Sequence, residues 1–174
     1  MNYTIFIGGT VILLLFSWFY SVRHKRYHGI TRFFAFETIF ILLLMNLKIW
    51  FQNPFSFFQI ISWILLISSV FFTLIGFILL IKNGKPDINI ENTSKLVKSG
   101  IYGYIRHPLY FSLFLLGTGV MLKNPDIIQL GLGTMNIIAI YFTARIEEKE
   151  MIMKFGEEYS EYIKETKMFI PFLI

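Results

Sequence analysis

The sequence predicts an all-α membrane protein that crosses the bilayer five times and ends in an amphipathic helix. Hydrophobic residues make up 55% of its 174 residues, and charged residues only 16%, against about 25% charged in typical globular domains. The 20 Phe, 9 Tyr and 3 Trp residues exceed what a small soluble core can bury. Mean hydropathy is +0.62. We therefore expect a chain solvated mainly by lipid.

Three apolar runs in the first half of the chain predict the first three spans, at 3–22, 33–51 and 57–81. A bilayer-spanning helix needs roughly 20 mainly apolar residues, and the first and third runs carry no charge. The second run holds Glu37 and Lys48 near its two ends. Long charged side chains can reach the membrane surface from such positions, so we expect both to be structural.

Two further runs, at 108–122 and 127–144, predict the fourth and fifth spans. The dipeptide Asn124-Pro125 between them favours a tight turn. These two spans should therefore form a helical hairpin. We expect residues 1–174 to form a single integral-membrane domain.

The positive charges predict the topology. The loop after the first run holds four Lys or Arg residues, the loop after the third run holds five, and the tail after the fifth run holds five. Only Lys48 and Lys123 fall elsewhere. Cytoplasmic loops carry such an excess, so we expect the N-terminus outside and the C-terminus in the cytoplasm.

The net charge of +5 does not indicate nucleic-acid binding, because the basic residues sit in short loops rather than along one polar face. The chain has no Cys, which excludes disulfides, thiolate zinc sites and cysteine nucleophiles. We expect no metal and no nucleic-acid partner. Nearly all polar chemistry then lies on the cytoplasmic side, in the segments 94–110 and 145–171.

The first polar segment, 94–110, contains Gly100 and Gly103, which favour a turn. Pro108 suits the first position of a helix, with His107 as its cap. A helix N-terminus can hold a carboxylate or phosphate, and Arg106 would add a charge-assisted donor. The alternative is structural: Tyr and Arg beside a membrane helix are often interfacial anchors, and a His at a helix start is often only a cap.

The second polar segment predicts a helix from 145 to about 166. Its apolar side chains recur at helical spacing: Met151, Ile152, Phe155, Tyr159, Tyr162 and Ile163. That face could lie on the membrane surface or against the first polar segment. Glu147 and Glu148 come about one turn past the membrane, where an unpaired carboxylate is costly and often functional. Structural pairing with nearby cations is the alternative.

One set of residues in this order resembles a known family. The set comprises Leu96-Val97, Gly100-Ile101-Tyr102, Arg106-His107-Pro108-Leu109-Tyr110, Glu147-Glu148, Phe155-Gly156, Tyr159, Tyr162 and Ile170-Pro171. It covers residues 94–171 and resembles the isoprenylcysteine carboxyl methyltransferase family of integral-membrane S-adenosylmethionine (SAM) enzymes. The resemblance implies a SAM pocket at the cytoplasmic membrane face and a lipophilic acceptor that enters from the bilayer between helices.

The resemblance also implies site residues. Those expected to bind the cofactor SAM are Ser94, Lys95, Leu96, Val97, Gly100, Tyr102, His107, Pro108, Leu109, Tyr110 and Glu147. The eukaryotic pattern has an Arg four residues before the first Glu, where this chain has Thr143. The sequence around Arg145 is more similar to prokaryotic relatives, including methanethiol methyltransferases.

The catalytic candidates are Arg106, Arg145 and Glu148. A carboxylate acceptor needs an orienting cation, for which either Arg is a candidate. A thiol or amine acceptor must be deprotonated, and His107 or Glu148 can assist. The resemblance implies an isoprenylcysteine-like carboxylate as the acceptor, with a small thiol or a phospholipid amine as alternatives. The alternative hypothesis, from a different functional class, is a membrane scaffold without catalytic activity.

Overall fold

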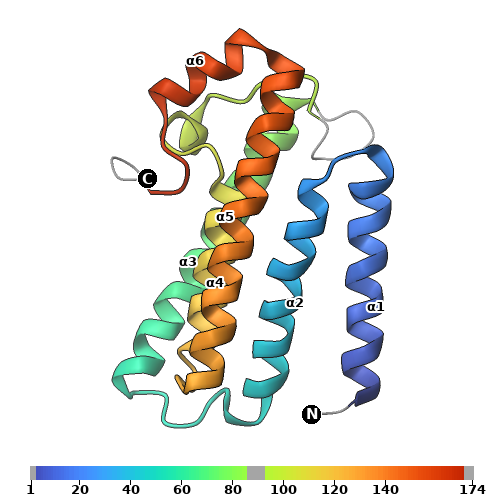
Figure 1. The fold of residues 1–174 in the computed structure, drawn as a ribbon. Helices are drawn as coiled ribbons and strands as arrows, with labels where there is room; N and C mark the ends of the chain where they lie inside the picture. The colour runs from blue at the N-terminus through green and yellow to red at the C-terminus, as the bar shows by residue number, and fades with distance from the viewer. Residues whose placement is uncertain (1–2, 86–92, 171–174) are drawn as a thin grey trace.

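The computed structural model describes residues 3–85 and 93–170 (Figure 1). Its six helices are α1 (Tyr3–Tyr20), α2 (His28–Asn46), α3 (Phe57–Gly84), α4 (Pro108–Met121), α5 (Ile127–Phe155) and α6 (Glu157–Glu165). Short 3₁₀ turns occupy Val22–His24, Leu47–Ile49 and Gly100–Gly103. No strand occurs in the two described ranges, so the predicted all-α class is confirmed.

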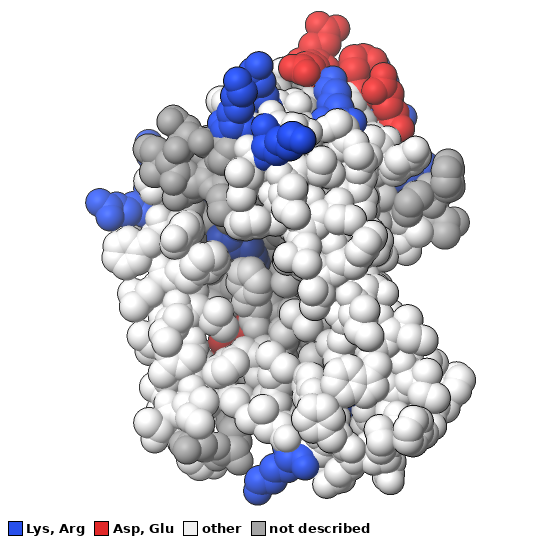
Figure 2. All heavy atoms as spheres, turned by 180° about the vertical axis from the view of Figure 1, so that it is seen from behind, with Lys and Arg blue, Asp and Glu red and all other residues white. Residues whose placement is uncertain are grey.

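Four segments are long and apolar enough to cross a membrane: Tyr3–His24, His28–Ile49, Phe57–Gly84 and Ile127–Phe155. Most apolar side chains of the first and third of these segments are exposed. Of the residues in α1, only Ser17 is buried. In Figure 2, charged side chains gather at the end that carries α6, and the flanks below are almost free of charge. The chain is an integral membrane protein.

The second helix differs from the predicted span at 33–51, because α2 begins at His28 and ends at Asn46. Its start is held by Glu150, whose carboxylate accepts from the His28 backbone N–H at 3.2 Å and contacts the ring Nδ1 at 2.7 Å. As a result, Glu37 lies in the middle of α2, and the expectation that it lies near an interface is wrong. The Thr10 hydroxyl of α1 donates to Glu37 at 2.7 Å.

The fourth helix has the predicted position but is short. The 14 residues of α4 span about 21 Å at 1.5 Å per residue, less than the roughly 30 Å of a bilayer core. Pro108 is its first residue and His107 its N-cap, as the sequence predicts. The hairpin with α5 is also present, since a short turn over 122–126 joins the two helices.

The fifth helix continues well beyond the predicted span of 127–144, as one helix to Phe155. The predicted continuous helix over 145–166 is interrupted at Gly156, where φ is +60°. This left-handed conformation favours glycine. The chain turns there and resumes as a separate helix, α6.

The last helix, α6, is amphipathic, as predicted for the C-terminal end. Tyr159 and Tyr162 are buried on its inner face, while Glu157 and Glu158 are exposed. The Tyr162 hydroxyl donates to the carbonyl of Tyr102 at 2.6 Å. The apolar face of α6 therefore packs against the first polar segment rather than on the membrane surface.

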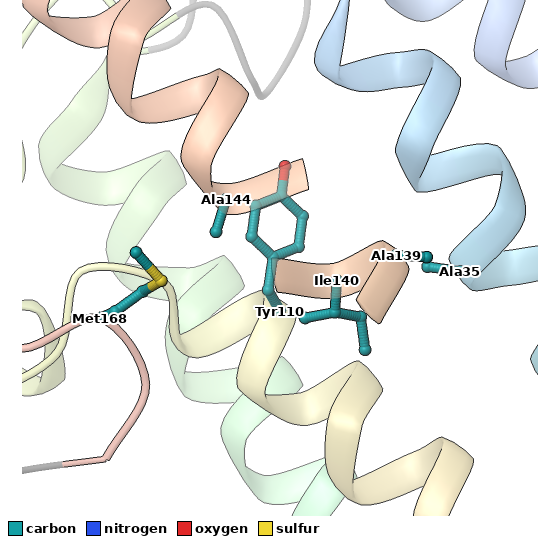
Figure 3. Packing of buried hydrophobic residues seen from close by; sticks show 6 residues of the cluster. All are labelled: Ala35, Tyr110, Ala139, Ile140, Ala144 and Met168. Carbon is teal, nitrogen blue, oxygen red and sulfur yellow. The ribbon is translucent and has the colours of Figure 1, made fainter. Parts of the chain in front are cut away.

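The helices pack in pairs, with α2 against α5, α3 against α4, and α1 on α2. Small side chains let α2 and α5 approach closely. The buried cluster at their contact comprises Ala35, Tyr110, Ala139, Ile140, Ala144 and Met168 (Figure 3). Asn136 of α5 adds a hydrogen bond to the Ala35 carbonyl at 2.9 Å. Tight packing and buried amides thus hold the bundle together.

Gly117 provides a test of this packing. A Cβ at this position would lie 2.3 Å from Asn136 Oδ1, and the Asn136 amide is held by Ala35 and by Thr38 at 3.2 Å. Gly117→Ala is therefore expected to destabilise the protein by about 1–3 kcal/mol, measured by thermal unfolding in detergent. Gly131→Ala is the matched control, because nothing lies within 4 Å of its Cβ. Equal stability of the two variants would contradict this packing.

Candidate functional site

The two polar segments meet at the end of the bundle that carries α6. The backbone N–H groups of Arg106 and His107 donate to the carbonyls of Lys167 and Met168 at 2.8 and 3.1 Å. The Lys167 N–H returns a bond to the Tyr104 carbonyl at 3.0 Å. Segments about 60 residues apart in sequence are thereby joined directly beside the start of α4.

A cavity of about 340 Å³ lies beneath this junction. Nine of the predicted site residues line it: Leu96, Val97, Tyr102, Arg106, His107, Pro108, Leu109, Tyr110 and Glu147. The remaining predicted residues lie outside its lining: Ser94, Lys95, Gly100, Arg145 and Glu148. Cavities of this size commonly hold small molecules or cofactors.

Glu147 is the acidic group of the cavity wall. Its carboxylate lies 3.4 Å from Arg26 Nη2 and 3.6 Å from His107 Nδ1, and its side chain is 17% exposed. The Tyr110 hydroxyl also bonds to it. Arg26 and His107 thus lie beside an acidic group that the wall presents to the cavity.

Glu148 lies outside the cavity lining and is paired. Arg106 Nε donates to it at 2.7 Å, and both side chains are less than 10% exposed. Arg106 also donates to the carbonyl of Ile163 at 3.2 Å and to that of Thr166. The Arg106 guanidinium therefore fastens α6 to α5 through three partners, although Arg106 itself borders the cavity.

Two further side chains lie beside the Glu148 carboxylate. His107 Nε2 lies 3.5 Å from its Oε1. Arg145 Nη1 lies 3.5 Å from the same carboxylate, with its side chain 52% exposed. Arg145 is thus a peripheral contact in this arrangement.

The segment before α2 contributes a cluster that the sequence analysis missed. Arg26 Nε lies 3.3 Å from Glu150, and Arg26 bridges Glu150 to Glu147. His28 is fully buried against the same Glu150 carboxylate. The available signal was charge complementarity: basic residues over 23–32 face an acidic cluster over 147–150, but the sequence analysis used them only for topology.

Loss of the Glu150 charge is expected to weaken this cluster. Glu150→Gln removes the charge that pairs with Arg26 and His28, so the variant should unfold at a lower temperature than wild type.

Thermal unfolding in detergent measures this loss. Glu161→Gln is the control, because Glu161 makes an exposed pair with Lys164. Equal stability of the two variants would contradict the role of Glu150 in this cluster.

Aromatic groups complete the polar half of the cavity. Burial raises the pKa of Tyr102 and of Tyr159 well above the usual range, so both stay neutral. The His107 ring stacks on Tyr110 at a centroid distance of 5.4 Å. These groups offer flat faces to a bound ring or cation. No group of three His, Asp or Glu residues within 3–85 and 93–170 is arranged to hold a metal ion.

The cavity lining also includes apolar side chains from the first three helices. Phe16, Phe36 and Phe77 line it from α1, α2 and α3, and Arg32 of α2 also lines it. Figure 2 shows a hollow on the face drawn there, with blue and red atoms within it. The sequence analysis assigned none of these residues to the site, because a Phe in a membrane span is indistinguishable from a lipid-facing one.

The comparisons with known proteins point to one family. The model of the isoprenylcysteine carboxyl methyltransferase (ICMT) family matches residues 63–154. The human protein-S-isoprenylcysteine O-methyltransferase is 39% identical over 97 residues, which cover 53% of this chain and 31% of the human one. The Dictyostelium discoideum and Saccharomyces cerevisiae proteins of that name are 41% and 36% identical over 81 and 87 residues.

Those two matches cover 44% and 48% of this chain and 32% and 35% of the relatives. The chain thus spans about a third of the length of these curated relatives. No solved structure matches significantly. The matched stretch includes α4 and Glu147 and excludes α1, α2 and α6.

Proposed function

The chain belongs to the isoprenylcysteine carboxyl methyltransferase family, and we propose that it is a SAM-dependent methyltransferase of the membrane. Its proposed acceptor is the carboxylate of a lipophilic, isoprenylcysteine-like molecule. One observation carries the proposal: residues of the family-like set from 96–110 and Glu147 line a single cavity. The lining of that cavity combines polar and aromatic groups with apolar side chains.

The polar and aromatic residues of the cavity lining fit SAM. The Glu147 carboxylate suits the cofactor's ammonium or ribose hydroxyls, and the start of α4, at Pro108, suits its carboxylate. Tyr102 and Tyr110 offer aromatic faces for adenine or the sulfonium. Arg106 was a candidate for the cofactor carboxylate, but its bonds to Glu148 and two carbonyls favour a positioning role.

When bound, SAM supplies an electrophilic methyl group. The chain's own contribution is to align the two reactants and exclude water, which can be worth ~7–11 kcal/mol. A carboxylate acceptor reacts without a base. A thiol or amine would need one. Glu148 lies outside the cavity lining and is paired with Arg106, which leaves His107 as the better candidate.

We also propose how the chain crosses the membrane. The four long spans and the shorter α4 together make five crossings. The excess of Lys and Arg at the α6 end favours a cytoplasmic C-terminus and active site, and an N-terminus outside.

Transfer of labelled methyl from SAM by the purified protein tests the proposal. N-acetyl-S-farnesylcysteine, a small thiol and phosphatidylethanolamine are offered in separate reactions. The proposal predicts alkali-labile label on the farnesylcysteine, as expected for a carboxyl methyl ester. Label only in the thiol or the lipid would retain the SAM chemistry and overturn the acceptor. No label and no SAM binding would favour a non-catalytic scaffold.

A further inference from the structure

The turn between α1 and α2 fixes the backbone of Arg26. The Arg26 N–H donates to the Ser21 carbonyl at 3.1 Å, and the Arg26 carbonyl accepts from the Gly29 N–H at 3.3 Å. Lys25, just before it, has a φ of +59°, a left-handed conformation that few residues other than glycine adopt. Gly29 packs so closely that a Cβ there would lie 2.5 Å from the Ser21 Cβ. The Arg26 side chain therefore leaves the turn from a defined place.

That side chain contacts two carboxylates of α5. Arg26 Nε lies 3.3 Å from Glu150 Oε2, and Arg26 Nη2 lies 3.4 Å from Glu147 Oε1. The two glutamates are three residues apart and so lie on one face of the helix. A guanidinium is planar and carries several donors in a fixed geometry, whereas an ammonium is a point charge. Arg26 thus links the position of one carboxylate to that of the other.

The two carboxylates have different surroundings. Glu147 lines the cavity and Glu150 does not. Glu150 is fixed by the start of α2, because it accepts from the His28 N–H at 3.2 Å and lies 2.7 Å from the ring Nδ1. The side chains of Arg26, Glu147 and Glu150 are 14%, 17% and 12% exposed, so their contacts are screened less than those of a surface pair. A continuous line of polar contacts therefore runs from α2 to the cavity wall.

We propose that Arg26 and Glu150 are positioning residues for the cofactor and that they act through Glu147. Arg26, anchored on Glu150, holds the Glu147 carboxylate in the orientation that meets the cationic or hydroxyl group of the ligand. Orienting a group before the ligand arrives reduces the entropy lost on binding. This inference rests on the proposed function and deepens it, because it extends the cofactor site to the α1–α2 turn, outside the matched residues 63–154.

A double-mutant cycle on S-adenosylhomocysteine affinity, measured by calorimetric titration in detergent, tests the inference. Arg26→Gln and Glu150→Gln should each weaken binding by about threefold or more. In the Glu147→Gln background each should change it by less than about twofold, because the carboxylate to be oriented is gone. Arg23→Gln is the matched control and should bind like wild type, since Arg23 is an exposed cation of the same turn, outside the cavity lining.

A merely structural role predicts the same loss of affinity in both backgrounds, and that result overturns the inference. Unchanged affinity in a folded Arg26→Gln variant overturns it as well. If Arg26→Gln does not fold, Arg26→Lys decides: affinity should still fall by about threefold, since a lysine keeps the charge but lacks the planar donors, and unchanged affinity contradicts the inference. A wild-type protein that does not bind S-adenosylhomocysteine overturns the proposed function itself.

Discussion

Replacing Glu147 by Gln is expected to weaken SAM binding by about tenfold to a hundredfold. The carboxylate borders the cavity, and Arg26, His107 and Tyr110 hold it in place. Gln keeps the size of the side chain and removes the charge. A hydrogen bond to a charged group contributes about 1.5–3 kcal/mol, and 1.4 kcal/mol corresponds to tenfold in affinity.

Calorimetric titration of SAM into the purified variants measures this effect. Acceptor binding should change less than SAM binding, because Glu147 is assigned to the cofactor. Glu157→Gln is the matched control, since Glu157 is exposed on α6 and outside the cavity lining. Unchanged SAM affinity in Glu147→Gln, in a protein that unfolds at the wild-type temperature, would refute the assignment.

Replacing Arg106 by Gln is expected to produce the largest loss of stability, about 3–5 kcal/mol. Breaking a buried ion pair leaves the other charge buried and unpaired, and Glu148 is 5% exposed. The change also removes donors to the carbonyls of Ile163 and Thr166. We therefore expect the segment from α6 onward to detach before the bundle unfolds.

Thermal unfolding in detergent measures the loss, and limited proteolysis reports detachment of α6. Arg145→Gln is the matched control, because Arg145 contacts the same Glu148 carboxylate from a position 52% exposed. Exposed ion pairs contribute about 0–1 kcal/mol, so this variant should behave like wild type. Equal stability of both variants would contradict the role of Arg106 in holding α6 against α5.

Local features of the sequence predicted the helices well where the signal lies nearby. The apolar runs predicted the five helices α1 to α5, and Pro108 predicted the first residue of α4. The hairpin after Asn124-Pro125 is present, and the Asp126 side chain caps α5 by accepting from the Gln129 N–H at 2.8 Å. Each of these depends on neighbours within a few residues.

Features that depend on distant partners could not be read in this way. The start of α2 depends on Glu150, which is 122 residues from His28. Arg106 looked available for a ligand because its partner Glu148 is 42 residues away. The partners of Glu150 are equally distant in sequence, since its carboxylate contacts Arg26 and His28.

The site was predictable in part for the same reason. The order of the motifs along the chain predicted the cavity-lining residues from 96–110 and Glu147. The opposite wall from α1 and α2 has no such motif, and the family match does not reach it. Thr143, where the resemblance implies an Arg, donates to the Thr31 hydroxyl at 2.9 Å, and the neighbouring residue of Thr31 is Arg32.

The central claim is that the cavity between α4 and Glu147 binds SAM. Titration of S-adenosylhomocysteine into the purified wild-type chain tests it most directly, because binding requires no knowledge of the acceptor. We predict one saturable site per chain, competed by SAM and weakened by Glu147→Gln. A folded wild-type protein that binds neither S-adenosylhomocysteine nor SAM would contradict the account.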